Sequence, residues 1–276
     1  MTAPLLEARS LVKEFESRGV RRRGRAPFRA VDDVGVAVSA AETLAIVGES
    51  GSGKSTTARL LARLLEPTSG SIHLEGEDVT RAQGTGLAHL RRSVQFVFQD
   101  PYSSLNPRHD VERIISAPLR YQGLRSGTSN SRRVSELLER VGLRPEHARR
   151  YPHQFSGGQA QRIGIARALA VEPKVVICDE AVSALDVSVQ AQVIELLRDL
   201  QRDLGIAFVF IAHDLAVVRQ LAHRVAVMSG GRIVEQGRTD AIFNAPQEQY
   251  TKELIAAVPR IRPEWDRQRR SRRSTP

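Results

Sequence analysis

The sequence predicts an α/β fold with a parallel core sheet, an antiparallel β layer before it and a helical insertion within it. Three short runs, residues 44–47, 175–178 and 207–212, are almost wholly apolar, as in strands that are covered on both faces of a parallel sheet. Residues 5–39 carry partly alternating apolar residues, which indicates strands near the N-terminus. Residues 100–170 instead show the helical spacing of apolar residues.

The N-terminal residues are expected to supply the antiparallel layer. Residues 5–15 are predicted to form a strand, the basic stretch 17–27 a loop, and residues 28–39 a strand pair. Phe15, at the end of the first strand, is a candidate to stack on a nucleotide base, because such stacking stabilises by about 1–3 kcal/mol with any base. Phe28 is the competing candidate, and a core aromatic at a strand end is the alternative interpretation of Phe15.

A phosphate-binding loop is predicted where the first apolar run ends. The pattern Gly-x-x-x-x-Gly-Lys-Ser follows this strand and opens a helix in which Leu60, Leu61 and Leu64 share one face. Small residues let several N–H groups point at one anion, and the helix N-terminus adds partial positive charge. Lys54 would reach the outer phosphates, and the Ser55 hydroxyl would coordinate Mg²⁺, which prefers oxygen ligands. The residues expected to contact the nucleotide here are Gly48, Glu49, Ser50, Gly51, Ser52, Gly53, Lys54, Ser55 and Thr56.

The middle of the chain changes from strands to helices. Residues 93–98 are expected to form a strand that ends at Gln99, and the helical insertion begins at about residue 100. Within it, Val134, Leu137, Leu138 and Val141 form one helix face at i, i+3, i+4 and i+7 spacing.

A further helix is expected to start at residue 156. Ser156 is placed to be its N-cap, and the pair Gly157 and Gly158 leaves backbone amides exposed at the helix start, which suits a second anion site. A simple cap is the alternative interpretation. The stretch ends at Gln159.

Three buried strands end in residues with useful chemistry. The ends are Gly48, the pair Asp179 and Glu180, and His213. In open α/β sheets, ligands bind beyond the carboxyl ends of the strands, so these ends are expected to meet at one edge. Asp179 would orient the Mg²⁺ shell, Glu180 would orient or deprotonate an attacking water, and His213 would donate to the departing phosphoryl oxygens. Gln99 would complete the Mg²⁺ shell. Taken singly, a strand-end Glu is usually a surface residue and such a His a core residue.

Composition excludes several classes of protein. The 276 residues are 41% hydrophobic, as in globular chains with a buried core. No run reaches the roughly 18 apolar residues of a membrane span. Residues 1–10 lack the apolar region of a signal peptide, so a cytosolic protein is expected. Cys178 is the single cysteine, which excludes an internal disulfide or a cysteine-rich metal site. It is expected to be a small core residue.

The charge is strongly basic and unevenly spread. The net charge is +10, and only four of the 41 basic residues are lysines. Arginines concentrate at residues 18–29 and 260–273, which suggests an anionic partner, either nucleic acid or a membrane surface. A solvated loop and tail is the alternative. The predicted domain spans residues 1–259, with its helical part at about 100–170, and residues 260–276 are expected to form a basic, disordered tail.

Taken together and in order, these motifs resemble the ATP-binding subunit of an ABC transporter. The resemblance covers roughly residues 5–259. It implies a P-loop NTPase of the ABC type, with a RecA-like core, an N-terminal antiparallel β subdomain and a helical insertion. It implies ATP and Mg²⁺ as cofactors, with Ser55, Gln99 and Asp179 near the metal and Phe15 near the adenine. The motifs are the Walker A loop 48–56, the Q-loop at Gln99, the signature 155–159, the Walker B strand 175–180, the D-loop 183–186 with Asp186, and the switch histidine His213.

A narrower resemblance is to the ATPases of peptide and nickel importers. It does not separate peptides from nickel or other cargo. Two positions depart from that group: Ala181 follows Glu180 where proline is usual, and Ala160 follows the signature where arginine is usual. Neither removes a reactive group, so an active ATPase is expected. The stretches that carry the match are residues 98–108, 150–155, 184–192, 250–254 and 257–259.

The family implies a mechanism that one chain cannot complete. Its signature, Ser156 to Gln159, would cover the ATP held by another nucleotide domain, so the chain would pair with itself or with a sister subunit. Closure would pass through the helical insertion to permease subunits at the inner face of the cell membrane, with a substrate-binding protein in the same complex. Two alternatives are an ABC-type ATPase acting on nucleic acid and a nucleotide sensor without turnover. Proteins of the first kind commonly carry two ATPase units or zinc cysteines, and this sequence shows one set of motifs and a single cysteine, so the first alternative is less expected. Glu180 and His213 argue against the second.

Overall fold

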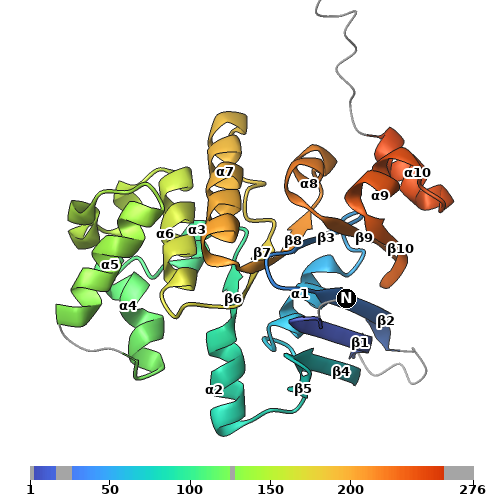
Figure 1. The fold of residues 1–276 in the computed structure, drawn as a ribbon, viewed down its shortest axis with the longest axis horizontal. Helices are drawn as coiled ribbons and strands as arrows, with labels where there is room; N and C mark the ends of the chain where they lie inside the picture. The colour runs from blue at the N-terminus through green and yellow to red at the C-terminus, as the bar shows by residue number, and fades with distance from the viewer. Residues whose placement is uncertain (1–2, 17–26, 125–127, 258–276) are drawn as a thin grey trace, which may run out of the picture.

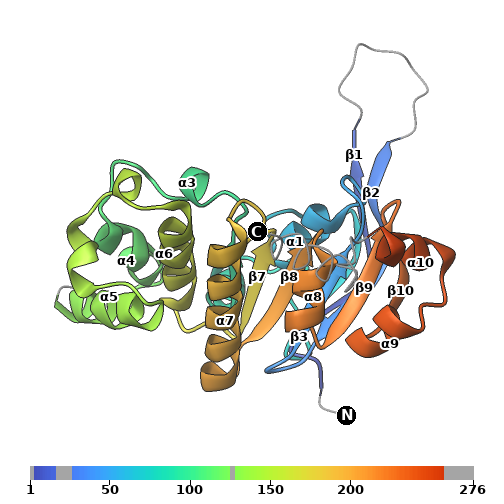
Figure 2. The same cartoon turned by 90° about the horizontal axis from the view of Figure 1, so that it is seen from above.

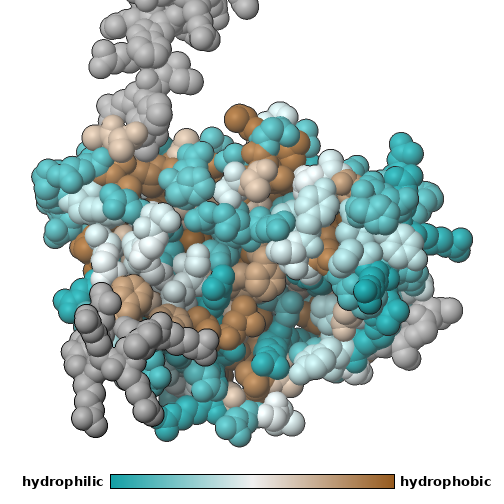
Figure 3. All heavy atoms as spheres, turned by 180° about the vertical axis from the view of Figure 1, so that it is seen from behind, coloured by the Kyte–Doolittle hydropathy of each residue, from teal (hydrophilic) through white to brown (hydrophobic). Residues whose placement is uncertain are grey.

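The structure is a computed structural model that describes residues 3–16, 27–124 and 128–257 (Figure 1). The loop expected over residues 17–27, apart from Pro27, and the tail expected over residues 260–276 lie outside the described residues. Among the described helices, none is long and apolar enough to cross a membrane. The face seen in Figure 3 mixes hydrophilic and hydrophobic residues.

A six-stranded sheet forms the centre of the molecule. The order is β10-β9-β3-β8-β7-β6, and every pair is parallel except β9 with β10. Strands β3, β7 and β8 are buried along their whole length, as their apolar runs predict. The bounds are β3 (Thr43–Val47), β6 (Val94–Val97), β7 (Val175–Asp179), β8 (Ala207–Ala212), β9 (Arg224–Ser229) and β10 (Arg232–Arg238).

Helices cover this sheet. The helices α7 and α8 stand along one side of it, and α1 lies between the sheet and the N-terminal strands (Figures 1 and 2). Helix α1 ends at Leu61 and does not extend to Leu64 as the apolar spacing had suggested, because Arg63 adopts a positive φ of 50°. Leu64 is therefore exposed and not part of the buried helix face. The bounds are α1 (Lys54–Leu61), α7 (Val187–Leu204), α8 (Leu215–Leu221), α9 (Thr239–Asn244) and α10 (Gln249–Ala256).

The antiparallel layer has the order β2-β1-β4-β5. Residues 28–39, expected to form a strand pair, instead form the single strand β2. The pairing of β1 with β2 shifts register near Asp33, whose φ is 54°, so the alternation of apolar residues breaks within one strand. The bounds are β1 (Leu6–Phe15), β2 (Phe28–Val38), β4 (Ser69–Leu74) and β5 (Glu77–Asp78).

The helical insertion lies at one end of the molecule (Figure 1). Its predicted face is buried: Val134, Leu137, Leu138 and Val141 are at most 1% exposed. The preceding helix α2 (Gly84–Ser93) was not expected, because it contains two glycines and buries only Leu90 and Ser93. The insertion comprises α3 (Pro101–Ser104), α4 (Val111–Tyr121), α5 (Thr128–Arg140), two short 3₁₀ turns and α6 (Gly157–Leu169).

The central strands divide the interior into two apolar clusters. Alternate residues of a strand point to opposite faces. Val176 and Cys178 join the cluster that includes α7, α8 and the helical insertion, whereas Val175 and Ile177 join the cluster that includes the antiparallel layer and α1. Cys178 is fully buried, as expected for a small core residue. Burial, with the neighbouring Asp179, raises the pKa of its thiol to about 12, so it stays protonated and unreactive.

Gly70 tests how closely the neighbouring strands β1 and β4 approach each other within the antiparallel layer. Its φ is +89°, and a Cβ there would lie 2.3 Å from the carbonyl oxygen of Ser10. Gly70→Ala is therefore expected to lower the free energy of unfolding by about 2–4 kcal/mol, from the clash and from the left-handed backbone. Gly76→Ala is the matched control, because Gly76 has φ +86° but no atom within 4 Å of its Cβ position. It is expected to cost about 1 kcal/mol. Urea unfolding measures both, and equal losses would show that the clash relaxes.

Candidate nucleotide site

The predicted phosphate loop joins β3 to α1. Its shape is set by close contact with a neighbouring strand end: a Cβ at Gly48 would lie 2.0 Å from the carbonyl oxygen of Met228 on β9. The turn after β9 also contacts the phosphate loop, because Gly231 N–H donates to the Ser52 carbonyl at 3.0 Å. Helix α1 begins with no side-chain cap, so its first N–H groups remain free to bind an anion.

Lys54 is folded into this loop and is only 5% exposed. Its ammonium donates to the carbonyl oxygens of Gly48 at 2.8 Å and Glu49 at 2.7 Å. Burial lowers the pKa of Lys54, against the opposing charges of Glu180, Asp179 and Glu49. The cation is therefore held by two carbonyl oxygens of the loop, which phosphate oxygens could replace.

Ser55 and Asp179 supply oxygen atoms beside Lys54. The Ser55 hydroxyl donates to Asp179 Oδ1 at 2.8 Å, and the Asp179 side chain is nearly buried. Burial raises the pKa of Asp179, and the bond from Ser55 and the charge of Arg59 oppose that shift. The described residues hold no cluster of three His, Cys, Asp or Glu side chains that could bind a metal alone. A hydroxyl and one carboxylate nevertheless fit Mg²⁺, which completes its shell with substrate phosphates and water.

Three strand ends meet at Glu180. Gln99 follows β6 and donates to Glu180 Oε2 at 2.8 Å, and Nδ1 of His213, which follows β8, lies 3.5 Å from the same oxygen. Glu180 has a φ of 49°, an uncommon conformation for a residue other than glycine. This turn directs its side chain away from that of Asp179, which bonds to Ser55. The structure thus brings together Gln99, Glu180 and His213, which were predicted from separate strand ends.

The aromatic candidates lie opposite one another. Phe15 and Phe28 are register partners at the end of the β1–β2 hairpin, and they are 39% and 62% exposed. Phe15 is therefore not a buried core residue. Because directly paired residues in an antiparallel sheet point to the same face, the hairpin presents two exposed rings side by side.

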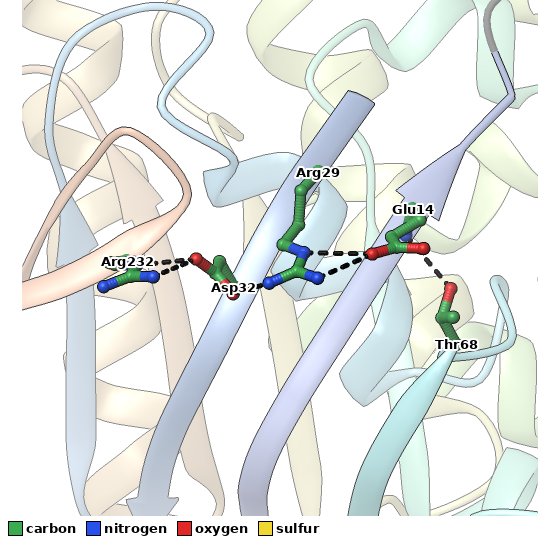
Figure 4. Close-up of polar contacts among 5 residues, drawn as sticks. All are labelled: Glu14, Arg29, Asp32, Thr68 and Arg232. Atoms are coloured by element: carbon green, nitrogen blue, oxygen red, sulfur yellow. Dashed lines mark hydrogen bonds and ion pairs between the residues drawn. The ribbon is translucent and has the colours of Figure 1, made fainter. Parts of the chain in front are cut away.

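A chain of ion pairs next to these rings was not predicted. Arg29 donates to Glu14 and to Asp32, and Asp32 also accepts from Arg232 at 2.6 Å (Figure 4). The hydrogen bonds from Arg232 and Arg29 hold the pKa of Asp32 below its usual value. Because Asp32 N–H also donates to the Gly231 carbonyl at 2.8 Å, this chain connects β2 to the turn that holds the phosphate loop. No sequence signal marks it, since Asp32 and Arg232 are 200 residues apart.

The signature residues form a capped helix start. The Ser156 hydroxyl accepts from Gln159 N–H at 3.4 Å, and Gln159 Oε1 accepts from Ser156 N–H at 3.1 Å, which confirms Ser156 as the N-cap of α6. Asp186 caps the neighbouring helix α7 by accepting from Val189 N–H at 2.9 Å. Within the described ranges, no hydrogen bond joins residues 156–159 to residues 48–56. Both views place α6 in the helical insertion and α1 beside the central sheet, so the signature lies apart from the phosphate loop of its own chain (Figures 1 and 2).

The segment after Gln99 contacts the signature directly. The Tyr102 hydroxyl donates to the Phe155 carbonyl at 2.8 Å, and the Gln161 side chain donates to the Phe98 carbonyl at 3.4 Å. Through these two hydrogen bonds, a movement of the segment around Gln99 would also shift the start of α6.

The sequence is similar to known protein families and to known proteins. Residues 31–183 match the family model described as "ABC transporter", and residues 234–276 match "Oligopeptide/dipeptide transporter, C-terminal region". The chain is 54% identical over 268 residues to the glutathione import ATP-binding protein GsiA of Escherichia coli (strain K12) and to that of Salmonella typhi. These alignments cover 97% of this chain but only 43% of the relatives.

Solved structures share the fold of this chain. The dimeric, ADP- and phosphate-bound ATP-binding cassette MJ0796 superposes with a TM-score of 0.74 at 28% identity, over 85% of this chain and 98% of that one. For cbiO1 from Clostridium perfringens, part of the ABC transporter complex cbiONQ, the TM-score is 0.75 at 28% identity, over 94% of this chain and 98% of that one. The predicted ABC-type nucleotide-binding fold is confirmed. Since the first family model covers more than half of its residues, the chain belongs to the ABC transporter family.

Proposed function

We propose that the chain binds ATP with Mg²⁺, hydrolyses it, and thereby powers the import of small peptides through separate permease subunits. The observation that carries the hydrolytic part is the meeting of Gln99 and His213 at one oxygen of Glu180, beside the pair Ser55 and Asp179. The match to GsiA and to the oligopeptide/dipeptide C-terminal region supports peptides as cargo.

Each side chain has a task in phosphoryl transfer. Lys54 and the free amides at the start of α1 would bind the phosphates, which needs mainly positioning and charge neutralisation. Mg²⁺, held near Ser55, Asp179 and Gln99, would neutralise charge on the phosphate oxygens. Glu180 would orient the attacking water and accept its proton. His213 would donate a hydrogen bond to the departing phosphoryl oxygens. For the base, Phe15 and Phe28 offer a stacking surface.

The active form is a pair of nucleotide domains. Because the signature lies apart from the phosphate loop of its own chain, Ser156 to Gln159 would close over ATP held by a second copy or a sister subunit, with Asp186 at the same interface. The dimeric form of MJ0796 supports this arrangement. The contacts of Tyr102 and Gln161 would pass closure to the helical insertion and from there to the permease, at the inner face of the cell membrane. A substrate-binding protein would deliver the cargo.

Import itself is tested in the assembled complex. The chain, purified with its permease in lipid vesicles, is expected to hydrolyse ATP several-fold faster when a peptide-loaded binding protein is added. Uptake of labelled dipeptides and glutathione into the vesicles measures transport, with nickel as the competing cargo. Stimulation by DNA or RNA but not by the permease would instead show a nucleic-acid ATPase.

Glu180→Gln separates binding from hydrolysis. The variant keeps the shape of the side chain but removes the base, so hydrolysis is expected to fall by about 100-fold or more while ATP binding persists. ATP should then hold the variant as a dimer in size-exclusion chromatography, and phosphate release measures turnover. Glu195→Gln, an exposed carboxylate on α7, is the control. Normal turnover in Glu180→Gln would remove Glu180 from this role.

Lys54→Ala tests the phosphate loop. Loss of a buried cation that bonds to phosphate oxygens is expected to raise the Kd for ATP by at least about tenfold, the size of a charged hydrogen bond. Titration calorimetry measures the Kd. Lys174→Ala, which breaks a surface pair with Glu75, is the control and should bind ATP as the wild type does. Tight binding by Lys54→Ala would contradict the proposed geometry.

A further inference from the structure

The C-terminal helix α10 touches the phosphate loop at one polar contact. The hydroxyl of Tyr250, near the start of α10, accepts a hydrogen bond from Glu49 N–H at 3.0 Å, across 201 residues of sequence. Both views place α10 beside β10, at the end of the molecule opposite the helical insertion (Figures 1 and 2). Tyr250 lies within the part of the chain that matches the oligopeptide/dipeptide C-terminal region.

This contact acts on the peptide group that holds Lys54. Glu49 N–H and the Gly48 carbonyl belong to one peptide unit, which is planar. The Gly48 carbonyl oxygen accepts from the Lys54 ammonium at 2.8 Å. Tyr250 therefore bonds to the N–H of this planar peptide group, and Lys54 bonds to its carbonyl oxygen. The Tyr250 hydroxyl thus restrains the orientation of the peptide group to which the Lys54 ammonium is bonded. Hydrogen bonds in such a chain also polarise one another.

Glu235 fixes the position from which Tyr250 acts. Its carboxylate, on β10, accepts from Gln247 N–H at 2.9 Å and from Glu248 N–H at 3.1 Å, the residues just before α10. Burial raises the pKa of Glu235, but the hydrogen bonds from the backbone of Gln247 and Glu248 and the charge of Lys252 oppose that shift. The net pKa is lowered, so the group stays charged. A carboxylate at a helix N-terminus is also favoured by the helix dipole.

We propose that Tyr250 is a positioning residue for the nucleotide site: through the Gly48–Glu49 peptide it sets the resting position of Lys54, and so the affinity for the triphosphate. This inference rests on the proposed function. It assigns to α10, held by Glu235, a role in binding nucleotide that is separate from any contact with cargo or permease. The competing role for Tyr250 is packing alone, because its ring also lies against the larger apolar cluster.

Tyr250→Phe distinguishes the two roles, since it removes only the hydroxyl. The Kd for ATP, measured by calorimetry in EDTA so that no turnover occurs, is expected to rise about three- to tenfold, the size of one neutral hydrogen bond. The melting temperature without nucleotide should stay within about 2 °C of the wild type. In the assembled transporter, the KM for ATP should rise while kcat stays within twofold, since Glu180 is untouched. Tyr121→Phe, at a tyrosine that is 73% exposed on α4, is the matched control.

Glu235→Gln gives a second measurement. It weakens the hydrogen bonds from Gln247 and Glu248 that position the start of α10. The Kd for ATP is therefore expected to rise, but by less than in Tyr250→Phe. A Tyr250→Phe variant that binds ATP as tightly as the wild type would overturn the inference and leave only a packing role. A wild-type chain that binds no ATP would instead overturn the proposed function itself, so the two failures are distinguishable.

Discussion

The close approach of neighbouring strand ends to the phosphate loop is the constraint on which the rest of the structure depends. The loop has room only for a glycine at position 48, because the Met228 carbonyl occupies the space of a side chain. Its carbonyls at Gly48 and Glu49 bind Lys54, and Ser52 accepts from the β9–β10 turn. With these acceptors engaged inside the protein, the N–H groups at the start of α1 are left for an anion. Without these contacts, the polar backbone groups of the loop would bond to water and would not be directed at one anion.

Two adjacent carboxylates, Asp179 and Glu180, lie at the end of β7 and have different surroundings. Burial favours the neutral form of Asp179, while Ser55 and nearby cations favour its charged form. The left-handed turn at Glu180 separates the two side chains, so that one faces the loop and the other faces Gln99 and His213. Such a backbone conformation costs about 1–2 kcal/mol and is typical of functional sites. It places two neighbouring carboxylates in different surroundings.

Long-range contacts join this site to the ends of the molecule. Tyr102 and Gln161 connect the residues around Gln99 to the signature helix in the helical insertion. At the other end, Tyr250 connects α10 to the loop, and the ion pairs around Asp32 connect the antiparallel layer to the turn that supports it. The candidate nucleotide site is therefore connected through these contacts to the helical insertion, to α10 and to the antiparallel layer.

The sequence alone determined the local features: the buried strands, the phosphate loop between a strand and a helix, the apolar face of the insertion and the reactive residues at three strand ends. Each is encoded by neighbouring residues with a fixed spacing, which a linear pattern can show. Only the tertiary structure decided the single bulged strand β2, the meeting of Gln99 and His213 at one oxygen, the ion pairs around Asp32, and the bond from Glu49 to Tyr250. The physical reason is that a hydrogen bond or ion pair between residues up to 201 positions apart forms only after packing has closed the chain between them.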